Sequence, residues 1–372
     1  MRFKGNDPIY PTLSNPESTD IYRQNIIRGE ASVGFINRYD DTDGSVRVYY
    51  GYGNHIIDDP RHFRSTDDRL GVIAYQNFSP WKHGNATAGF YFDTYTGRIP
   101  VSGGKPHQDG SMTTISRKRV NEYSPYITFS QGLISEMLNL NAGLRMVNSN
   151  KFHTQWIPQA GFVVRPADDW SIKASLAKGY RNPSFKELYL YRMSNPDLQP
   201  ERMMNYEVSA GHSFSKYLSC ELTAYYSKGG NMIQQVDMKN QNTGKFINKG
   251  VEISLTSHPV SNVMLNATYS YLHTSLRDLT GAPRHQYFFG ASWNPTKKLS
   301  IDAQLKGVGC LYVSSDNRHE NYATVDLRVA YRVAKPIQLQ VKLDNITDTR
   351  YEINRGYEMP GFTAMGGFKL DF

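Results

Sequence analysis

Alternation of apolar and polar residues, repeated along most of the chain, is the feature that most constrains this fold. In the stretch Asn321 to Val333, apolar residues occupy every second position and mostly polar residues lie between them. A strand places successive side chains on opposite faces, so this period predicts ribbons with one apolar and one polar face. The segments 337–344 and 362–372 repeat the pattern. Because the helical period is almost absent, the sequence predicts an all-β chain.

The alternating segments number about 17, and most are longer than the roughly 9 to 11 residues that a tilted strand needs to cross a bilayer. Strands of soluble sandwiches are usually shorter, about 5 or 6 residues. Besides the three segments already given, the predicted strands lie near residues 27–37, 44–52, 67–78, 82–95, 117–130, 137–149, 153–165, 169–180, 201–214, 217–237, 244–257, 262–274, 284–295 and 298–312.

Connections between these segments alternate between tight turns and long polar loops. The turns, rich in Pro, Asn, Asp and Ser, lie at 40–43, 79–80, 165–168, 215–216, 258–261, 294–297 and 334–336. The predicted long loops are 54–66, 96–116, 181–200, 275–283, 314–320 and 347–360. Short turns at one end and long loops at the other are typical of an outer-membrane barrel. A soluble sandwich or propeller is the alternative, but no repeat of about 40 residues is present to support it.

The composition agrees with a barrel. The chain has 372 residues and a formal net charge of +8, and its mean hydropathy is −0.56. It has no apolar run of the roughly 20 residues that a spanning helix needs, which excludes an α-helical membrane protein. A polar lumen face on every strand explains the low hydropathy. The 26 tyrosines suit a membrane interface. Residues 1–20 lack the apolar core of a signal peptide, so either the chain stays in the cytoplasm or its true beginning is missing.

No motif for catalysis, metal binding or nucleic-acid binding is present. The sequence lacks a nucleophile elbow, a zinc-protease helix motif and a P-loop, and its histidines and two cysteines occur singly. We therefore expect no enzyme, with no catalytic residues, and we expect no metal site, no cofactor and no nucleic-acid partner. The positive charge is assigned mostly to lumen and loops, with a weaker role in attracting anionic ligands.

The segment from Lys178 to Gly211 carries four short motifs in a fixed order. An aromatic-Arg-x-Pro element is followed by Glu-Leu-Tyr, by Asn-Pro-x-Leu-x-Pro-Glu and by Asn-Tyr-Glu. This set resembles the barrel segment of TonB-dependent receptors, as do Ile247–Leu255, Lys342–Glu352 and the closing residues. The motif residues are Tyr180, Arg181, Asn182, Pro183, Glu187, Leu188, Tyr189, Asn195, Pro196, Leu198, Pro200, Glu201, Asn205, Tyr206 and Glu207.

Three roles stay open for residues in and near this segment, namely a structural role in the loop, contact with the ligand and contact with the plug. Structural roles are expected for Pro183, Glu187, Leu188, Pro196, Leu198, Pro200, Glu201, Tyr206, Glu207 and the terminal Phe372, with Glu201 and Glu207 pairing with Arg181 or Arg202. Ligand contacts are predicted for Tyr180, Arg181, Tyr189, Tyr191, Arg192 and Asn195. Haem-type members carry an iron-coordinating histidine in this loop, but residues 184–194 contain none. The resemblance thus gives no support for haem coordination here.

The resemblance also implies an outer-membrane location in a Gram-negative bacterium, with long loops outside the cell. Phe372 ends an alternating strand, as in the signal that the barrel assembly machinery reads. Members of this family close at about 22 strands around a plug, and about 17 are counted here. The predicted fold is thus an incomplete antiparallel transmembrane β-barrel without a plug domain, with residues 1–26 as the remnant of an extracellular loop and residues 27–372 as the C-terminal part of the barrel.

The implied function is TonB-dependent uptake of a large scarce ligand of the ferric siderophore or cobalamin type. Contact with TonB would occur only through the missing plug, and the other expected partner is outer-membrane lipid. Ligand residues are expected from the loops 54–66, 96–116, 181–200 and 347–360. Two alternatives stay open, namely a passive outer-membrane pore and a non-functional receptor fragment.

Overall fold

The computed structural model describes residues 2–8, 21–58, 63–79, 81–101, 115–190, 193–276, 279–314 and 319–370. The chain divides into two units, each of which is described by itself. The first unit comprises Met1–Phe162, Leu176–Met204 and Gly229–Lys245. The second unit comprises Val163–Ser175, Asn205–Lys228 and Phe246–Phe372.

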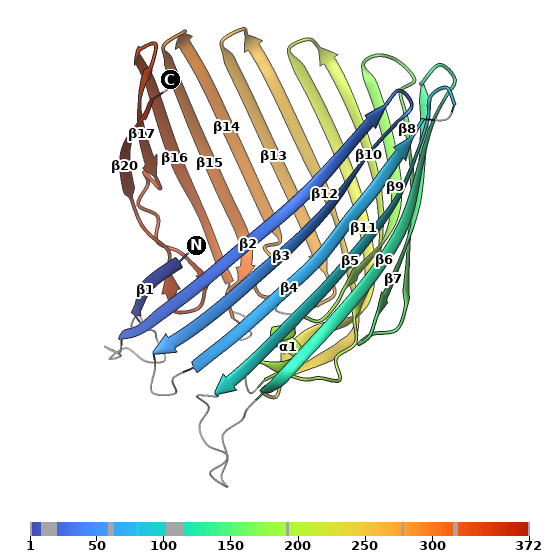
Figure 1. The fold of residues 1–372 in the computed structure, drawn as a ribbon. Coiled ribbons are helices and arrows are strands. Elements are labelled where there is room, and N and C mark those ends of the chain that lie inside the picture. The colour runs from blue at the N-terminus through green and yellow to red at the C-terminus, as the bar shows by residue number, and fades with distance from the viewer. Residues whose placement is uncertain are drawn as a thin grey trace. The chain divides into compact units, whose positions relative to one another are not determined.

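The first unit is an antiparallel sheet whose strands pair in chain order (Figure 1). It also contains one short helix, α1 (Phe185–Tyr189). Its strands are β1 (Arg2–Pro8), β2 (Ile21–Tyr39), β3 (Thr42–Asp58), β4 (Phe63–Phe78), β5 (Gly84–Val101), β6 (Ile115–Leu133), β7 (Leu138–Ser149) and most of β8 (Gln155–Val164). Four further strands contribute residues to both units, namely β9 (Trp170–Arg181), β10 (Glu201–Ser215), β11 (Leu218–Val236) and β12 (Lys239–Val260).

The second unit is also antiparallel, and from β12 to β17 and on to β20 each strand pairs with the next one (Figure 1). A short hairpin, β18 with β19, lies in the connection between β17 and β20. The strands of this unit are β13 (Val263–Thr274), β14 (His285–Thr296), β15 (Leu299–Tyr312), β16 (His319–Ala334), β17 (Ile337–Asp344), β18 (Glu352–Asn354), β19 (Tyr357–Glu358) and β20 (Thr363–Leu370). The all-β, antiparallel prediction is confirmed.

Strand register keeps apolar residues on one face across many strands. In the first unit, Val48 pairs with Val72, Val72 with Phe92 and Phe92 with Tyr123. In the second unit, Ile301 pairs with Val329 and Val329 with Val341. We call this side of each unit its apolar face. Large apolar side chains on it are exposed, for example Ile127 at 56% and Phe289 at 47%.

One residue further along the strands, the paired rows are polar. Tyr49 pairs with Gly71, Gly71 with Asp93 and Asp93 with Glu122. We call this side the polar face. The Tyr49 ring lies over Gly71, where a Cβ atom would collide with it, so the glycine leaves room for the aromatic ring. In the second unit, the alternation predicted for residues 321–333 and 337–344 is confirmed, because Val329 pairs with Val341 and the next row pairs Arg328 with Lys342. For the predicted segment 362–372 it is confirmed within the described residues, which end at Leu370.

Several predicted loops are partly strand. The segment 54–66 is strand as far as Asp58 and again from Phe63, and the segment 96–116 is strand up to Val101 and again from Ile115. Arg2–Pro8 also forms a strand, paired with β2, which itself begins at Ile21. Antiparallel pairing satisfies backbone hydrogen bonds without an apolar face, so strands continue past the point where the sequence pattern stops. The domain boundary at residue 26 stays a prediction.

Candidate functional site

Helix α1 begins at a capping box in the connection between β9 and β10. The Ser184 hydroxyl oxygen accepts a hydrogen bond from the Glu187 amide at 3.2 Å, and a Glu187 carboxylate oxygen accepts one from the Ser184 amide at 2.7 Å. This arrangement satisfies two amides that a helix start leaves without partners. Pro183 immediately precedes Ser184 and cannot donate, so it suits the irregular backbone before the cap. Leu188 points inward and is 1% exposed.

Arg181 joins the end of β9 to both α1 and β10. Its Nη1 and Nη2 donate to the Glu187 carboxylate at 2.9 and 3.2 Å. Its Nε and Nη2 donate to the Glu201 carboxylate at 2.7 and 2.8 Å. Glu201 also accepts a hydrogen bond from the Ile233 amide at 2.7 Å. A guanidinium held by two bidentate carboxylates has few donors left for a ligand.

The charge state of Glu187 follows from these contacts. Partial burial opposes ionisation, but the hydrogen bonds from Arg181 and Ser184 outweigh it, and the pKa of the Glu187 carboxyl lies below its ordinary value. The carboxylate is therefore ionised at neutral pH, as the Arg181 pairing requires.

The segment from Asn195 to Glu201 is fixed against the hairpin of β11 and β12. Asn195 donates through Nδ2 to the Asn240 carbonyl at 2.8 Å. The side chain of Asn242 bonds both the amide and the carbonyl of Gln199, at 2.7 and 2.8 Å. Leu198 is 1% exposed and packs with Leu188 and Phe152. These motif residues hold the loop together and onto the sheet.

The other predicted site residues are placed as follows. The half-buried Tyr180 donates from its hydroxyl to Asn182, whose Nδ2 donates to the Glu122 carboxylate at 2.6 Å. Pro196 precedes the buried Leu198, and Pro200 is fully buried. Tyr206 and Glu207 belong to the second unit, and Tyr206 is exposed on its apolar face. Tyr191, Arg192 and Phe372 lie outside the described residues.

An aromatic cluster with lysines beside it lies on the polar face of the first unit. The Phe185 ring is 5.2 Å from Tyr95 and 5.0 Å from Tyr189, edge to face in both pairs. The Lys118 and Lys151 ammonium groups each lie 6.0 Å from the centre of the Tyr189 ring. We call these five residues the aromatic–lysine cluster. Phe185 sits over Gly97, where a Cβ atom would come within 2.5 Å of its ring.

Sequence reasoning found only Tyr189 of this cluster. The other members come from β5, β6, the segment after β7 and the start of α1, so no local motif links them. Gly97 is the one local signal, because a glycine inside a strand often marks a close approach by another group.

Further from the long-loop end than the cluster, the polar face carries a charged network. Asp93 accepts from Arg69 Nε at 2.6 Å and from the Tyr49 hydroxyl at 2.9 Å. The Arg69 guanidinium also donates to the Tyr91 hydroxyl at 2.8 Å. Partly exposed charges paired in this way suit a wall that faces water rather than lipid.

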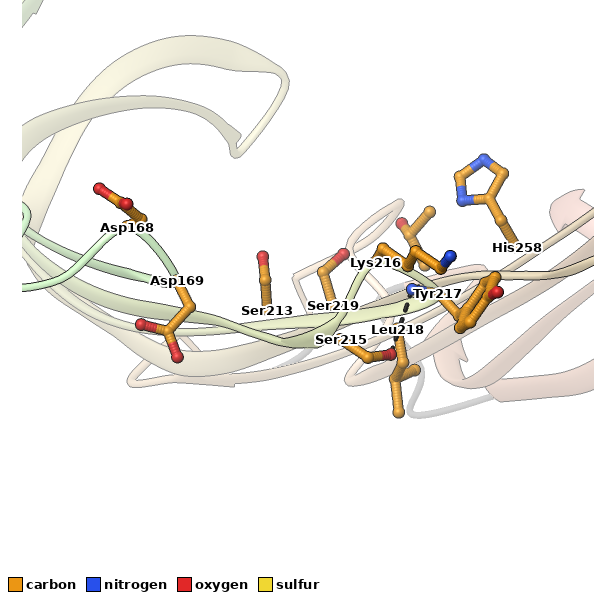
Figure 2. A pocket seen from close by; sticks show the side chains of 10 residues that line it. Asp168, Asp169, Ser213, Ser215, Lys216, Tyr217, Leu218, Ser219 and His258 are labelled. Carbon is orange, nitrogen blue, oxygen red and sulfur yellow. Dashed lines mark hydrogen bonds between the residues drawn. The ribbon is translucent and has the colours of Figure 1, made fainter.

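The second unit has a cavity of about 450 Å³ near its short turns. Asp168, Ser213, Ser219 and His258 line it, and Figure 2 shows the two serines between the aspartate and the histidine. Across the described part of the chain, no group of three or more His, Cys, Asp or Glu side chains is arranged to hold a metal ion. The described part also contains no helix with the length and apolar character needed to cross a membrane.

Comparison with known families decides the identity of this sheet. The sequence model described as TonB dependent receptor-like, beta-barrel matches residues 4–346. The chain belongs to this family. It is thus a TonB-dependent receptor barrel, a class of Gram-negative outer-membrane protein, and the apolar face is the one that such barrels turn to lipid.

Curated relatives of this receptor barrel are longer and have two kinds of name. The iron-regulated outer membrane virulence protein of Vibrio cholerae is 23% identical over 256 residues, which cover 58% of this chain and 39% of that protein. The vitamin B12 transporter BtuB of Photobacterium profundum is 23% identical over 201 residues, covering 50% of this chain and 33% of that protein. The chain therefore spans about two fifths or less of the relatives that it matches.

Solved structures show the same fold for this receptor barrel. The ferric enterobactin receptor PfeA of Pseudomonas aeruginosa superposes with a TM-score of 0.78 at 17% identity, covering 94% of this chain and 62% of that receptor. The family is one of receptors, and BtuB and PfeA are named as a transporter and a receptor. The motif segment that carried the family resemblance is, in this structure, the loop held by Arg181 and Asn195.

Proposed function

We propose that this chain forms the C-terminal barrel part of a receptor for TonB-dependent uptake of a ferric siderophore. The names of the relatives support an iron chelate or cobalamin, and one local observation favours the chelate. That observation is the aromatic–lysine cluster, in which two ammonium groups lie beside the Tyr189 ring and the Phe185 ring joins it to Tyr95.

The chemistry of the cluster suits an anionic aromatic ligand. Ferric complexes of catecholates carry net negative charge and expose aromatic rings. Lys118 and Lys151 supply positive charge, while Tyr189 and Phe185 offer ring faces and edges for stacking. Cobalamin has no comparable negative charge, so it gains less from paired lysines.

In this proposal the motif loop positions the cluster. Arg181 and Asn195 hold α1 in place and contribute to binding through Phe185 and Tyr189 rather than by contact. Tyr180, Tyr191 and Arg192 remain proposed ligand contacts. Coupling to TonB through a plug, and insertion by the barrel assembly machinery through Phe372, are also part of the proposal.

Ligand binding by the purified, refolded chain tests this function. Quenching of intrinsic fluorescence by ferric enterobactin should saturate, and the Lys118→Gln/Lys151→Gln double variant should bind about tenfold or more weakly, since each lost charge contact removes about 1 kcal/mol. Lys342→Gln is the matched control, because Lys342 pairs with Asp344 in the second unit. Tighter binding of cobalamin than of the ferric chelate would contradict the siderophore assignment.

Two further measurements separate the alternatives. Steady conductance in planar bilayers without ligand or TonB would favour a passive pore. If no species changes its gel mobility on heating, the chain does not insert, and it is then a non-functional fragment.

A further inference from the structure

Three arginines lie on the apolar face of the first unit, beyond its outermost aromatic residues. On β6 this face presents Ile127, Tyr123, Arg119 and Arg117 in that order toward the long-loop end. Ile127 is 56% and Tyr123 43% exposed. The face thus passes from an apolar band through a tyrosine to exposed guanidinium groups, as at the boundary between the lipid core and the headgroups.

Neighbouring strands extend this boundary. On β3 the same face presents the exposed Tyr50 and Tyr52, followed by Asn54 and Ile56. Tyr52 pairs with Asp68 on β4, and Asp68 pairs with Thr96 on β5. Arg98 donates from Nε to the Thr66 hydroxyl at 3.0 Å, which brings its guanidinium to this face as well.

Two of the three arginines are oriented by hydroxyl groups, and the third is oriented by a carboxylate. Arg119 donates from Nε to the Thr96 hydroxyl at 3.3 Å, so threonine hydroxyls hold both Arg98 and Arg119. Arg117 makes a long ion pair with Asp68, with 3.5 Å between Nη2 and Oδ1. Asp67 also lies here but pairs with Arg28 at 3.5 Å. Among the described residues of this patch, three guanidiniums therefore face the one carboxylate of Asp68, which leaves 3 − 1 = +2 charges.

A cavity of about 230 Å³ lies at this position. Its lining includes Tyr50, Tyr52, Arg98 and Arg117 together with Asp67 and Asp68, and Arg119 adjoins it through its bond to the lining residue Thr96. Arginine binds phosphate in a bidentate manner, and basic pockets at the membrane surface bind lipid headgroups. Arg98 and Arg119 each donate from Nε to a threonine hydroxyl, and neither of these bonds uses an Nη group. The Nη groups can therefore donate to a phosphate.

We propose that Arg98, Arg117 and Arg119, the outer arginine patch, bind a phosphate group on the headgroup of an outer-leaflet lipid. The inference rests on the family assignment and on the predicted orientation with long loops outside the cell. It is independent of the siderophore proposal, because the patch lies on the face opposite to the aromatic–lysine cluster.

Lipid binding to the purified full chain in detergent tests the patch, with bis-phosphorylated lipid A as the probe. The Arg98→Gln/Arg117→Gln/Arg119→Gln variant should bind this lipid at least about tenfold more weakly than the wild type. Fully dephosphorylated lipid A should bind both proteins equally. Equal binding of the phosphorylated lipid by both proteins would overturn the proposal, as would complete competition by millimolar inorganic phosphate.

A variant that should gain affinity keeps the proposal testable if the triple variant misfolds. Asp68→Asn removes the one carboxylate beside Arg117, so it should tighten binding of the phosphorylated lipid about threefold or more. Unchanged or weaker binding would count against the patch even if the triple variant failed to fold. Arg145→Gln is the control and should leave lipid affinity unchanged, because Arg145 pairs with Tyr126 on the polar face.

Discussion

Arg181 connects three consecutive elements, namely β9, α1 and β10. Its guanidinium bonds Glu187 in α1 and Glu201 at the start of β10, and the two carboxylates are only 22% exposed. Removing the arginine leaves these carboxylates close together without their shared cation.

We therefore expect Arg181→Ala to lower the free energy of unfolding by about 1–2 kcal/mol, because the arginine itself is partly exposed and its ion pairs are screened by solvent. Urea unfolding in lipid vesicles, followed by tryptophan fluorescence, measures this change. Arg47→Gln is the control, since Arg47 makes one exposed contact to Glu30 at 3.3 Å and should cost less than about 0.5 kcal/mol. Equal effects of the two variants would refute a structural role for Arg181.

Acidification should weaken the same connection. The pKa of Glu187 is lower in the folded chain than its ordinary value of about 4.3. A lowered folded-state pKa stabilises the fold above the unfolded-state pKa, and this contribution is lost as the pH falls through the folded-state pKa. The stability difference between wild type and Glu187→Gln should thus be largest near pH 7 and shrink below about pH 4. A difference that grows on acidification would show that the Glu187 carboxylate is not held by Arg181.

At the scale of elements, one of the contacts that hold α1 on the sheet is the packing of Phe185 against β5. Phe185 lies over Gly97 of β5, and a Cβ atom there would come within 2.5 Å of the ring. Gly97→Leu should displace α1, because overpacking costs about 1–3 kcal/mol, and trypsin should then cleave after Lys186 about tenfold faster or more.

Gly244→Leu is the control for this substitution, because no atom lies within 4 Å of the position that its Cβ would take. Its cleavage rate after Lys186 should match the wild type. An unchanged rate in Gly97→Leu would show that α1 does not depend on this contact.

The long alternating strands were predictable from the sequence. The short strands and the side-chain contacts among the long loops were not. Alternation predicted β16 and β17 because one face of each must be apolar over its whole length. The β1 strand and the β18–β19 hairpin have no such pattern, so the sequence did not predict them. The sequence left open whether Glu201 pairs with Arg181 or Arg202, and the structure shows Arg181. The approach of Lys118 and Lys151 to Tyr189 depends on tertiary structure, so no local pattern predicts it.

At the scale of the whole molecule, an outer-membrane barrel requires that the apolar face of each strand meets lipid. Ile253 and Ser254 are neighbours on β12 and lie on opposite faces, since Ile253 pairs with Tyr269 and Ser254 with Thr268. Both side chains are exposed, so neither is needed to fill a core. In a soluble sheet an arginine would be tolerated at both positions.

Insertion of Ile253→Arg and Ser254→Arg into lipid vesicles is the most direct test of this claim. We expect Ile253→Arg to lower the free energy of unfolding by about 2–4 kcal/mol, the cost of arginine at the bilayer midplane, and Ser254→Arg to change it by less than about 0.5 kcal/mol. The heat-modifiable band should weaken only for Ile253→Arg. Equal tolerance of both substitutions, or a greater loss for Ser254→Arg, would contradict the assignment of the apolar face to lipid and with it the outer-membrane barrel.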